Sequence, residues 1–218
     1  TMPEKIRQLA KKILHEPVEI NIAISKPPEK IIQKAFVVYE PQKLPLIKKL
    51  LKEIPYKNAL IFCSRKQTVK QLTRELKHGG FNISEIHSDL EQSERESVLS
   101  AFTAGRIPVL VATDILSRGI DIDTIDVVIN YDVPGDGEDY VHRIGRTARA
   151  ETDGTAITLV SVEEQFKLLS IEELLGQPIP KAEVPAKFGE TPRYEPQQKK
   201  KFKKSFKKPF HKRGPGGP

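Results

Sequence analysis

The chain has 218 residues, 38% of them apolar, and a formal net charge of +7, which fits one ordinary domain with additional segments outside its core. The single cysteine, Cys63, excludes a disulfide framework, and the chain has neither a long apolar run nor a signal-peptide pattern, so we expect a cytoplasmic protein without membrane contact. The positive charge is local, because residues 197–218 contain eight Lys, one Arg and no acid, a charge of +9 that leaves the rest of the chain at −2.

The first 30 residues predict a helix, a strand and a linker. Apolar residues recur at helical spacing over residues 3–14, with a proline in the first turn. Residues 18–24 alternate between apolar and polar side chains, as a half-buried strand does. Residues 25–30 contain two consecutive prolines, which block both a helix and a strand ladder, so we expect a linker there.

Residues 31–177 alternate between short apolar runs and amphipathic helical segments. The apolar runs are continuous and rich in β-branched residues, which is typical of strands buried on both faces of a parallel sheet. We expect strands at residues 32–39, 59–63, 83–87, 109–112, 127–130 and 155–160. We expect helices at residues 42–54, around 69–76, at 92–102, after residue 135 and up to residue 175. The predicted fold class is α/β, a mostly parallel sheet with helices on both faces.

Polar residues directly follow two of the predicted strands. Ser64 comes after the second strand, and Thr113 and Asp114 come after the fourth. Ligands of open parallel sheets bind outside the carboxyl ends of the strands. The sequence therefore predicts a binding site at this edge of the sheet.

From residue 178 the composition changes. The last 41 residues contain eight prolines, and apolar periodicity stops. The end is a low-complexity run of lysines and phenylalanines. We expect residues 178–218 to form a disordered tail, Pro-rich at first and basic at its end.

Residues 140–149, with the sequence Tyr-Val-His-Arg-Ile-Gly-Arg-Thr-Ala-Arg, are the stretch that carries most chemistry. A helix is predicted to begin near Asp136, whose carboxylate can cap free backbone N–H groups. If the helix continues, spacings of four and three place His142, Arg146 and Arg149 on one face. Two guanidiniums on one face can clamp phosphate oxygens. The alternative is a solvated basic face without a ligand.

Four segments in this order resemble motifs of the DEAD-box RNA helicases. They are Ile61-Phe62-Cys63-Ser64, Gln92-Ser93-Glu94-Arg95, the run from Ala112-Thr113-Asp114 to Arg118-Gly119-Ile120-Asp121, and His142-Arg143-Ile144-Gly145-Arg146-Thr147-Ala148-Arg149. The resemblance covers residues 1–177 but only the second half of a typical family member. Residues 171–180 are similar to the bacterial RhlE-like branch.

The resemblance implies a domain organisation. Residues 31–177 would be the C-terminal RecA-like domain of the helicase, and residues 25–30 the linker before it. Residues 1–24 would be the last helix and strand of the first RecA-like domain, with Thr1 closing a Ser-Ala-Thr motif. The alternative for this segment is an ordinary N-terminal arm.

The resemblance also implies half of an ATP site. The chain contains neither a phosphate-binding Gly-x-x-x-x-Gly-Lys loop nor an Asp-Glu-Ala-Asp motif, so ATP and Mg²⁺ would be held by the first domain in cis. Arg146 and Arg149 would be arginine fingers for the γ-phosphate. Asp121 would accept hydrogen bonds from the ribose hydroxyls, unless it only caps a turn. His142 would communicate across the cleft between the domains.

Contacts to an RNA backbone are implied as well, without readout of base sequence. Arg95 would bind a phosphate, Gln92 would orient it, and Thr113 would donate its hydroxyl to a phosphate. Alternatively, Gln92 and Glu94 only begin a helix and Thr113 only packs. The remaining expected RNA-binding residues are Ser64, Arg65, Asp114, Gly119 and, in the tail, Lys203 and Lys207.

More than one hypothesis remains open for the role of the tail and for the function of the chain. Lysines can follow phosphates while phenylalanines stack on bases, although a solubilising tail would have the same composition. The predicted function is the C-terminal half of an ATP-dependent RNA helicase that acts as a monomer. Two rival hypotheses are a stand-alone RNA-binding module and a DNA helicase of the same superfamily. A histidine at position 142 favours RNA, because DNA-directed relatives more often have glutamine there.

Overall fold

The computed structural model describes residues 4–15, 31–114, 125–147 and 154–196, and its centre is one parallel sheet of six strands in the order β1-β6-β5-β2-β4-β3. The strands are β1 Ile31–Val37, β2 Ala59–Phe62, β3 Ile83–Ile86, β4 Val109–Ala112, β5 Val127–Asn130 and β6 Gly154–Val160. Every residue of β2, β4 and β5 is buried, as the continuous apolar runs predicted. The predicted α/β class and parallel pairing are confirmed.

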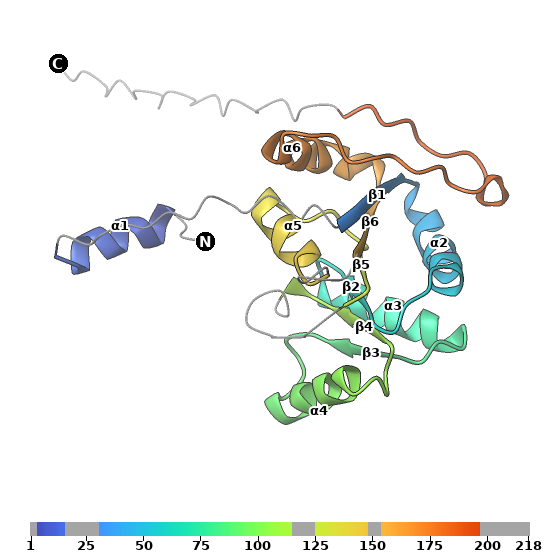
Figure 1. The fold of residues 1–218 in the computed structure, drawn as a ribbon, viewed down its shortest axis with the longest axis horizontal. Helices are drawn as coiled ribbons and strands as arrows, with labels where there is room; N and C mark the ends of the chain where they lie inside the picture. The colour runs from blue at the N-terminus through green and yellow to red at the C-terminus, as the bar shows by residue number, and fades with distance from the viewer. Residues whose placement is uncertain (1–3, 16–30, 115–124, 148–153, 197–218) are drawn as a thin grey trace, which may run out of the picture.

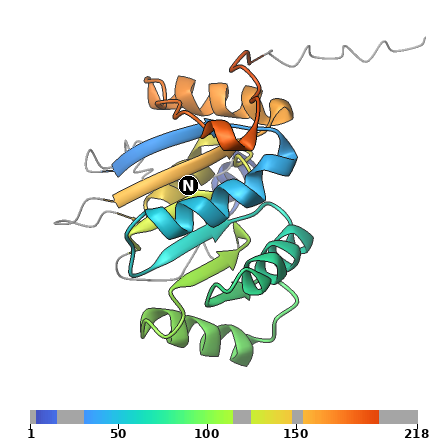
Figure 2. The same cartoon turned by 90° about the vertical axis from the view of Figure 1, so that its right-hand side faces the viewer.

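Helices cover both faces of this sheet. The helices of the described residues are α1 Glu4–Ile13, α2 Glu40–Glu53, α3 Lys66–His78, α4 Gln92–Thr103, α5 Gly137–Ile144 and α6 Gln165–Leu175, with the short 3-10 helices η2 Val162–Glu164 and η3 Ala186–Phe188, and those from α2 to α6 cover the sheet. Helices α2 and α3 pack on one face, in front of the sheet in Figure 2. Helices α4, α5 and α6 pack on the other face, and Figure 1 shows α5 opposite α2.

The helix ends follow the capping rules. Asp136 is the N-cap of α5, and its Oδ1 accepts a hydrogen bond from the Asp139 N–H at 2.8 Å. Helix α6 stops at Gly176, whose φ of +68° is a left-handed conformation that a side chain disfavours. Both boundaries were predicted from these residues.

Helix α5 does not continue to Arg146, so the condition under which His142 and Arg146 would share one helical face is not met. The helix ends at Ile144, and Thr147 already forms a parallel bridge with Ile125. The Ile125 N–H donates to the Arg146 carbonyl at 3.4 Å, so the chain leaves the helix to run beside another segment. Arg146 therefore lies beyond the helix, and Arg149 lies outside the described residues.

The predicted start of the disordered tail at residue 178 is wrong, because residues 178–196 pack against the domain. We call residues 178–196 the strap. Its first part pairs with the edge strand β1: the Ala35 N–H donates to the Pro180 carbonyl and the Ala182 N–H donates to the Ala35 carbonyl, both at 2.8 Å. Figure 1 shows the strap running out to a turn near α2 and returning toward α6.

Polar side chains of the helices hold the strap in place. Gln42 of α2 donates to the carbonyls of Phe188 and Glu190 at 2.8 and 2.9 Å. Gln165 of α6 donates to the Arg193 carbonyl at 2.8 Å and accepts from the Glu195 N–H at 2.7 Å. Such bonds from side chains to an extended backbone leave no apolar period in the sequence, which is why the composition pointed to disorder instead.

Glu172 of α6 is the anchor of the strap. Its carboxylate is buried and accepts from the Ile179 N–H at 2.7 Å, from the Tyr194 hydroxyl at 2.6 Å and from the Lys181 ammonium. Burial, followed by the bond to Glu172, raises the pKa of Tyr194 far above its ordinary value of 10.0. A buried carboxylate with three donors stabilises the strap only while all of them are present.

The N-terminal segments are described only in part. Helix α1 confirms the predicted first helix, and its Leu9 and Ile13 are 52% and 70% exposed. The predicted strand at residues 18–24, the linker at 25–30 and the basic part of the tail from residue 197 lie outside the described residues. Among the described helices, none is both long and apolar enough to span a membrane.

Candidate functional site

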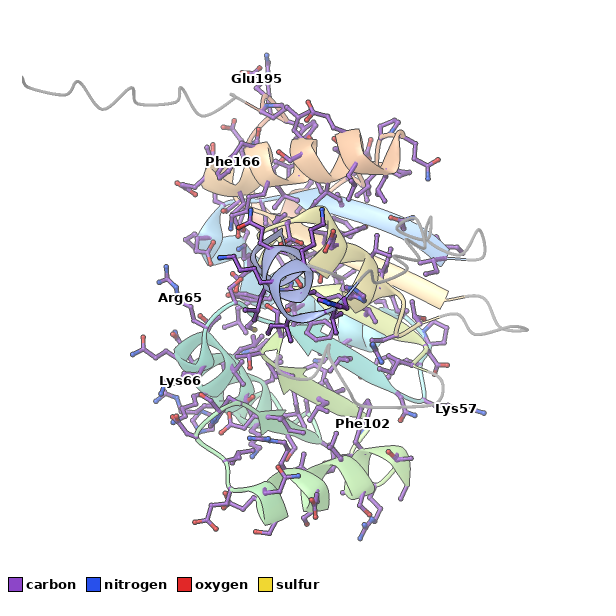
Figure 3. The ribbon with its side chains drawn as sticks, turned by 90° about the vertical axis from the view of Figure 1, so that its left-hand side faces the viewer. Lys57, Arg65, Lys66, Phe102, Phe166 and Glu195 are labelled. Atoms are coloured by element: carbon purple, nitrogen blue, oxygen red, sulfur yellow. The ribbon has the colours of Figure 1, made fainter. Side chains whose placement is uncertain are left out.

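The carboxyl ends of β2, β4 and β5 meet at one edge of the sheet, which we call the carboxyl edge. The Cys63 N–H donates to the Ala112 carbonyl at 2.9 Å, and the Tyr131 N–H donates to the Phe62 carbonyl at 2.8 Å. The residues that follow these strands are therefore neighbours, as the sequence predicted. Figure 3 shows Arg65, just after β2, at this edge and Lys57, just before β2, at the opposite one.

Arg143 of α5 organises the carboxyl edge, and the sequence analysis did not single it out. Its side chain is 1% exposed. Two of its nitrogens, Nε and Nη2, bind the two carboxylate oxygens of Asp114 at 2.6 and 2.9 Å. Its Nη1 donates to Asn130 Oδ1 at 3.2 Å and to the Asp132 carbonyl at 3.0 Å. The guanidinium thus connects α5 to the ends of β4 and β5 through a fork that lysine lacks.

The sequence did contain a signal for this ion pair. Arg143 lies three residues after Tyr140 and next to Ile144, and both of these neighbours are buried against the sheet. An arginine on the apolar stripe of a helix needs a buried acceptor. Asp114, predicted to bind RNA, is that acceptor, so its carboxylate holds α5 in place.

A second buried cation, Lys43 of α2, lies on the opposite face of the sheet. Its Nζ is 3.0 Å from Glu40, 3.2 Å from Glu164 and 3.7 Å from Asp132. Burial lowers the pKa of the Lys43 ammonium, but the surrounding carboxylates, led by Glu164, outweigh burial and hold it above its ordinary 10.5. Lys43 therefore stays charged at every physiological pH.

A polar cavity of about 260 Å³ opens beside this lysine at the carboxyl edge. Three cationic and three acidic side chains line it together with three hydroxyls: Lys43, Arg65, Lys167, Glu40, Asp132, Glu164, Ser64, Thr68 and Ser161. The cavity brings the predicted residues Ser64 and Arg65 together with α2 and the start of α6, which the sequence did not predict.

Ser64, Arg65 and Thr113 lie at the carboxyl edge, as predicted. Ser64 and Arg65 are exposed, and the Ser64 N–H donates to Asp132 Oδ2 at 2.7 Å. The hydroxyl of Thr113 is buried and has no hydrogen-bond partner among the described residues. A buried hydroxyl without a partner is costly, and a ligand oxygen would satisfy it.

The first turn of α4 carries Gln92 and Arg95. Gln92 Oε1 accepts from Arg95 Nη1 at 3.2 Å, and Arg95 Nη2 donates to the Leu90 carbonyl at 3.4 Å. Gln92 thus orients the guanidinium. Glu94 has the helix-starting role that was the alternative for this segment, because its carboxylate accepts from the Glu91 N–H at 2.9 Å.

An exposed ion cluster connects α3 to the loop before α4. Asp89 accepts from Lys66 at 2.7 Å and from Lys70 at 2.9 Å. The hydrogen bonds from Lys66 and then Lys70 lower the pKa of Asp89 to about 2. Lys66 projects from the carboxyl edge next to Arg65 in Figure 3, so the cluster adds positive charge there.

His142 and Arg146, the two predicted nucleotide-facing residues that the structure describes, are both half-buried near the end of α5. Gly145 lies between them, and a Cβ at this position would lie 2.9 Å from the Val141 carbonyl oxygen. Glycine therefore lets the chain turn tightly into Arg146. Asp121, Gly119, Arg149, Lys203 and Lys207 lie outside the described residues.

Comparison with known proteins gives a consistent result. Residues 42–151 match the family model of the helicase conserved C-terminal domain. The ATP-dependent RNA helicase CshA of Listeria monocytogenes is 42% identical over 174 residues, which are 79% of this chain and 34% of that protein. The chain spans about a third of the length of the curated relatives that it matches.

Solved structures share the fold. Escherichia coli DEAD-box protein SrmB, bound to regulator of ribonuclease activity A, has a TM-score of 0.69 and 34% identity, covering 78% of this chain and 99% of that one. Saccharomyces cerevisiae Dbp5, bound to RNA and ADP BeF3, has a TM-score of 0.75 and 32% identity, covering 84% of this chain and 49% of that one.

Proposed function

Because this chain belongs to the helicase conserved C-terminal domain family, as the C-terminal RecA-like domain of a DEAD-box protein, we propose that it forms one half of an ATP-dependent RNA helicase. The observation that carries this proposal is the carboxyl edge. One buried guanidinium, Arg143, holds α5 against the ends of β4 and β5, so that a nucleotide-facing segment and an RNA-facing loop share one rigid support.

On the nucleotide side, Arg146 and Arg149 would complete an ATP site whose other half belongs to the first RecA-like domain. Arginine fingers stabilise charge on the transferred phosphoryl group and contribute roughly 10³- to 10⁵-fold in rate. The tight turn at Gly145 supports this role, because it ends α5 and brings Arg146 to a half-buried position just beyond the helix. Asp121 would bind the ribose, and Mg²⁺ would be held by the first domain.

On the RNA side, Ser64, Arg65, Arg95 and Thr113 would grip a sugar–phosphate backbone. The exposed Arg65 and the half-buried Arg95 carry charge for phosphates, and the unpartnered Thr113 hydroxyl can donate to one. When both domains close on ATP, a strand gripped this way bends and no longer fits a duplex. RNA would be distinguished from DNA by its 2′-hydroxyls.

The basic tail, with Lys203 and Lys207, would add a second and weaker attachment to RNA. If about six of its nine charges meet a single strand, the slope of log affinity against log salt becomes steeper by about 4. We expect a chain shortened to end at residue 196 to lose this part of the slope. Filter binding of oligo(U) between 50 and 300 mM KCl measures it, and an unchanged slope would assign the tail to solubility alone.

Several properties of the whole protein are part of the same proposal. We propose that it acts in the cytoplasm as a monomer, with the first domain in cis. Its one cysteine is buried and unpaired, which suits a reducing compartment. Membership in the RhlE-like branch stays a prediction. Sedimentation of the chain at micromolar concentration tests the monomer, and a stable dimer would contradict it.

The test of the proposed function is strand separation. A two-domain protein, in which the first RecA-like domain of a DEAD-box protein precedes this chain, is mixed with matched short RNA and DNA duplexes and ATP. We expect separation of the RNA duplex only, and only with ATP. Equal activity on DNA would favour a DNA helicase, and RNA binding without separation would favour a stand-alone binding module.

A further inference from the structure

Asp132 is the one described residue that we find in contact with both buried cations of the carboxyl edge. It lies two residues after β5, and its side chain is 17% exposed. Its Oδ1 lies 3.7 Å from Lys43 Nζ, on the face of the sheet covered by α2 and α3. Its backbone carbonyl accepts from Arg143 Nη1 at 3.0 Å, on the face covered by α5.

The other carboxylate oxygen of Asp132 holds the loop after β2. Asp132 Oδ2 accepts from the Ser64 N–H at 2.7 Å. Ser64 and Arg65 are exposed, so this bond is a fixed point for a loop that otherwise borders solvent. A hydrogen bond to a carboxylate is about twice as strong as a neutral one.

The same residue therefore connects two elements that contact different ligands in the proposed function. The loop at Ser64 and Arg65 faces RNA, while α5 leads to Arg146 and the nucleotide. Arg143 also binds Asp114, directly after Thr113, so the connection extends to a third ligand-facing segment. Each step is a hydrogen bond between groups at the carboxyl edge.

We infer that Asp132 is a positioning residue that couples RNA contact at the loop after β2 to nucleotide contact at α5. This inference rests on the proposed function. A shift of α5 on ATP binding moves Arg143, and through Asp132 it moves the Ser64 N–H and the arginine beside it. RNA bound at the loop favours the same position of Ser64 and Arg143, so each ligand raises the affinity for the other by the same factor.

The coupling role can be separated from folding, because Lys43 has other partners. Glu40 and Glu164 remain at 3.0 and 3.2 Å from its Nζ when the Asp132 carboxylate is removed. The buried ammonium then stays paired, so we expect Asp132→Ala to fold. Asp132→Asn keeps an oxygen that can accept from the Ser64 N–H, and it serves as the conservative variant.

Asp126 provides a matched control at the opposite edge of the sheet. Its Oδ2 accepts from the N–H groups of Lys57 and Asn58 at 2.6 and 3.2 Å, directly before β2. Its side chain thus holds one end of β2 as Asp132 holds the other, and Figure 3 shows its partner Lys57 at the edge of the sheet opposite Arg65. Asp126→Ala removes two equivalent backbone contacts and leaves the bonds of Asp132 with Ser64 and Arg143 in place. The Asp126 carbonyl, which accepts from Thr147 Oγ1 at 3.2 Å next to Arg146, is retained in this variant.

The first experiment uses the chain itself and measures amide hydrogen exchange by NMR. We expect exchange at Ser64 to rise about tenfold in Asp132→Ala. We also expect it to rise about fivefold in Arg143→Lys, because the lost guanidinium donates to the Asp132 carbonyl. Unchanged Ser64 exchange in Arg143→Lys would overturn the coupling, because a purely local role predicts that result.

The second experiment measures ATP hydrolysis by the two-domain protein with and without oligo(U). We expect Asp132→Ala to reduce the stimulation by RNA about tenfold, Asp132→Asn to restore most of it, and Asp126→Ala to keep it within twofold. Equal stimulation in Asp132→Ala and Asp126→Ala would overturn the inference. If the unchanged protein shows no RNA-stimulated hydrolysis, the proposed function fails, and the exchange data alone decide whether Asp132 couples the loop to α5.

Discussion

At the scale of single residues, buried cations define the carboxyl edge. Arg143 lies between buried neighbours on α5 and the ends of two strands, so its charge is removed from water. Its N–H groups donate to four acceptor oxygens on three residues, and its guanidinium lies 5.2 Å from the ring of Phe62. The sequence pattern identified the flanking His142 and Arg146 but missed this residue, because helical periodicity alone does not show which acceptors a fold brings opposite a side chain.

We expect Arg143→Ala to lower the free energy of unfolding by about 2–4 kcal/mol, because it leaves the buried Asn130 and the Asp114 carboxylate without their donor. The Asp114 side chain is 40% exposed, so water can replace part of the lost hydrogen bonding and bring the loss of unfolding free energy toward about 2 kcal/mol. Arg143→Lys keeps the positive charge but loses the paired N–H donors of the guanidinium, so we expect a smaller loss of unfolding free energy than in Arg143→Ala. Urea unfolding followed by circular dichroism measures both. A loss below about 0.5 kcal/mol for Arg143→Ala would contradict the structural role.

At the scale of elements, the periodic segments were predictable and the aperiodic ones were not. Each described strand and helix of the body lies within a few residues of its predicted bounds, because apolar runs and glycine stops mark them in the sequence. The end of α5 was not predictable from the sequence, since the bridge between Ile125 and Thr147 is a tertiary contact. The strap was taken for tail, since Gln42, Gln165 and Glu172 hold its backbone from distant helices.

The strap predicts a contrast between two shortened chains. Ending the chain at residue 177 exposes the edge of β1 and leaves the Glu172 carboxylate without the donors that the strap supplies, so we expect a loss of roughly 2–5 kcal/mol and a tendency to aggregate. A chain that ends at residue 196 keeps these contacts, so we expect its free energy of unfolding to lie within about 0.5 kcal/mol of that of the full chain. Thermal unfolding compares the two. Equal unfolding temperatures for the two shortened chains would show that the strap contributes nothing to stability.

At the scale of the whole molecule, the rule that ligands bind at the carboxyl ends of parallel strands predicted from sequence alone which candidate residues lie together. Ser64 and Thr113 lie there because β2 and β4 are neighbours in register. The rule did not predict the cavity between α2, α3 and α6, because its walls come from elements about 100 residues apart in the chain that no local pattern connects.

Stability should fall at alkaline pH. Burial raises the pKa of Tyr140 and Tyr194 well above 10.0, and the Lys43 pKa also lies above its ordinary value. Each raised pKa contributes stability that is fully present below the pKa of the unfolded chain, near 10, and is lost as pH rises toward the folded value. Burial also raises the pKa of the Cys63 thiol well above its ordinary 9.0, so the loss begins near pH 9. We expect the unfolding midpoint to be level from pH 8 to about 9 and to drop above it, less so in Tyr194→Phe. An unfolding midpoint that stays unchanged up to pH 11.5 would contradict the burial of these tyrosines and of Lys43.

The most direct test of the central claim is the ATPase rate with saturating oligo(U). It is measured for this chain alone, for the two-domain protein, and for the two-domain protein with Arg146→Ala. The account predicts no hydrolysis by the chain alone, RNA-stimulated hydrolysis by the two-domain protein, and a loss of about 10³-fold or more in the variant, because a half-site without its arginine loses transition-state stabilisation. Hydrolysis by this chain alone, or full activity in Arg146→Ala, would contradict the claim that it supplies one half of an ATP site.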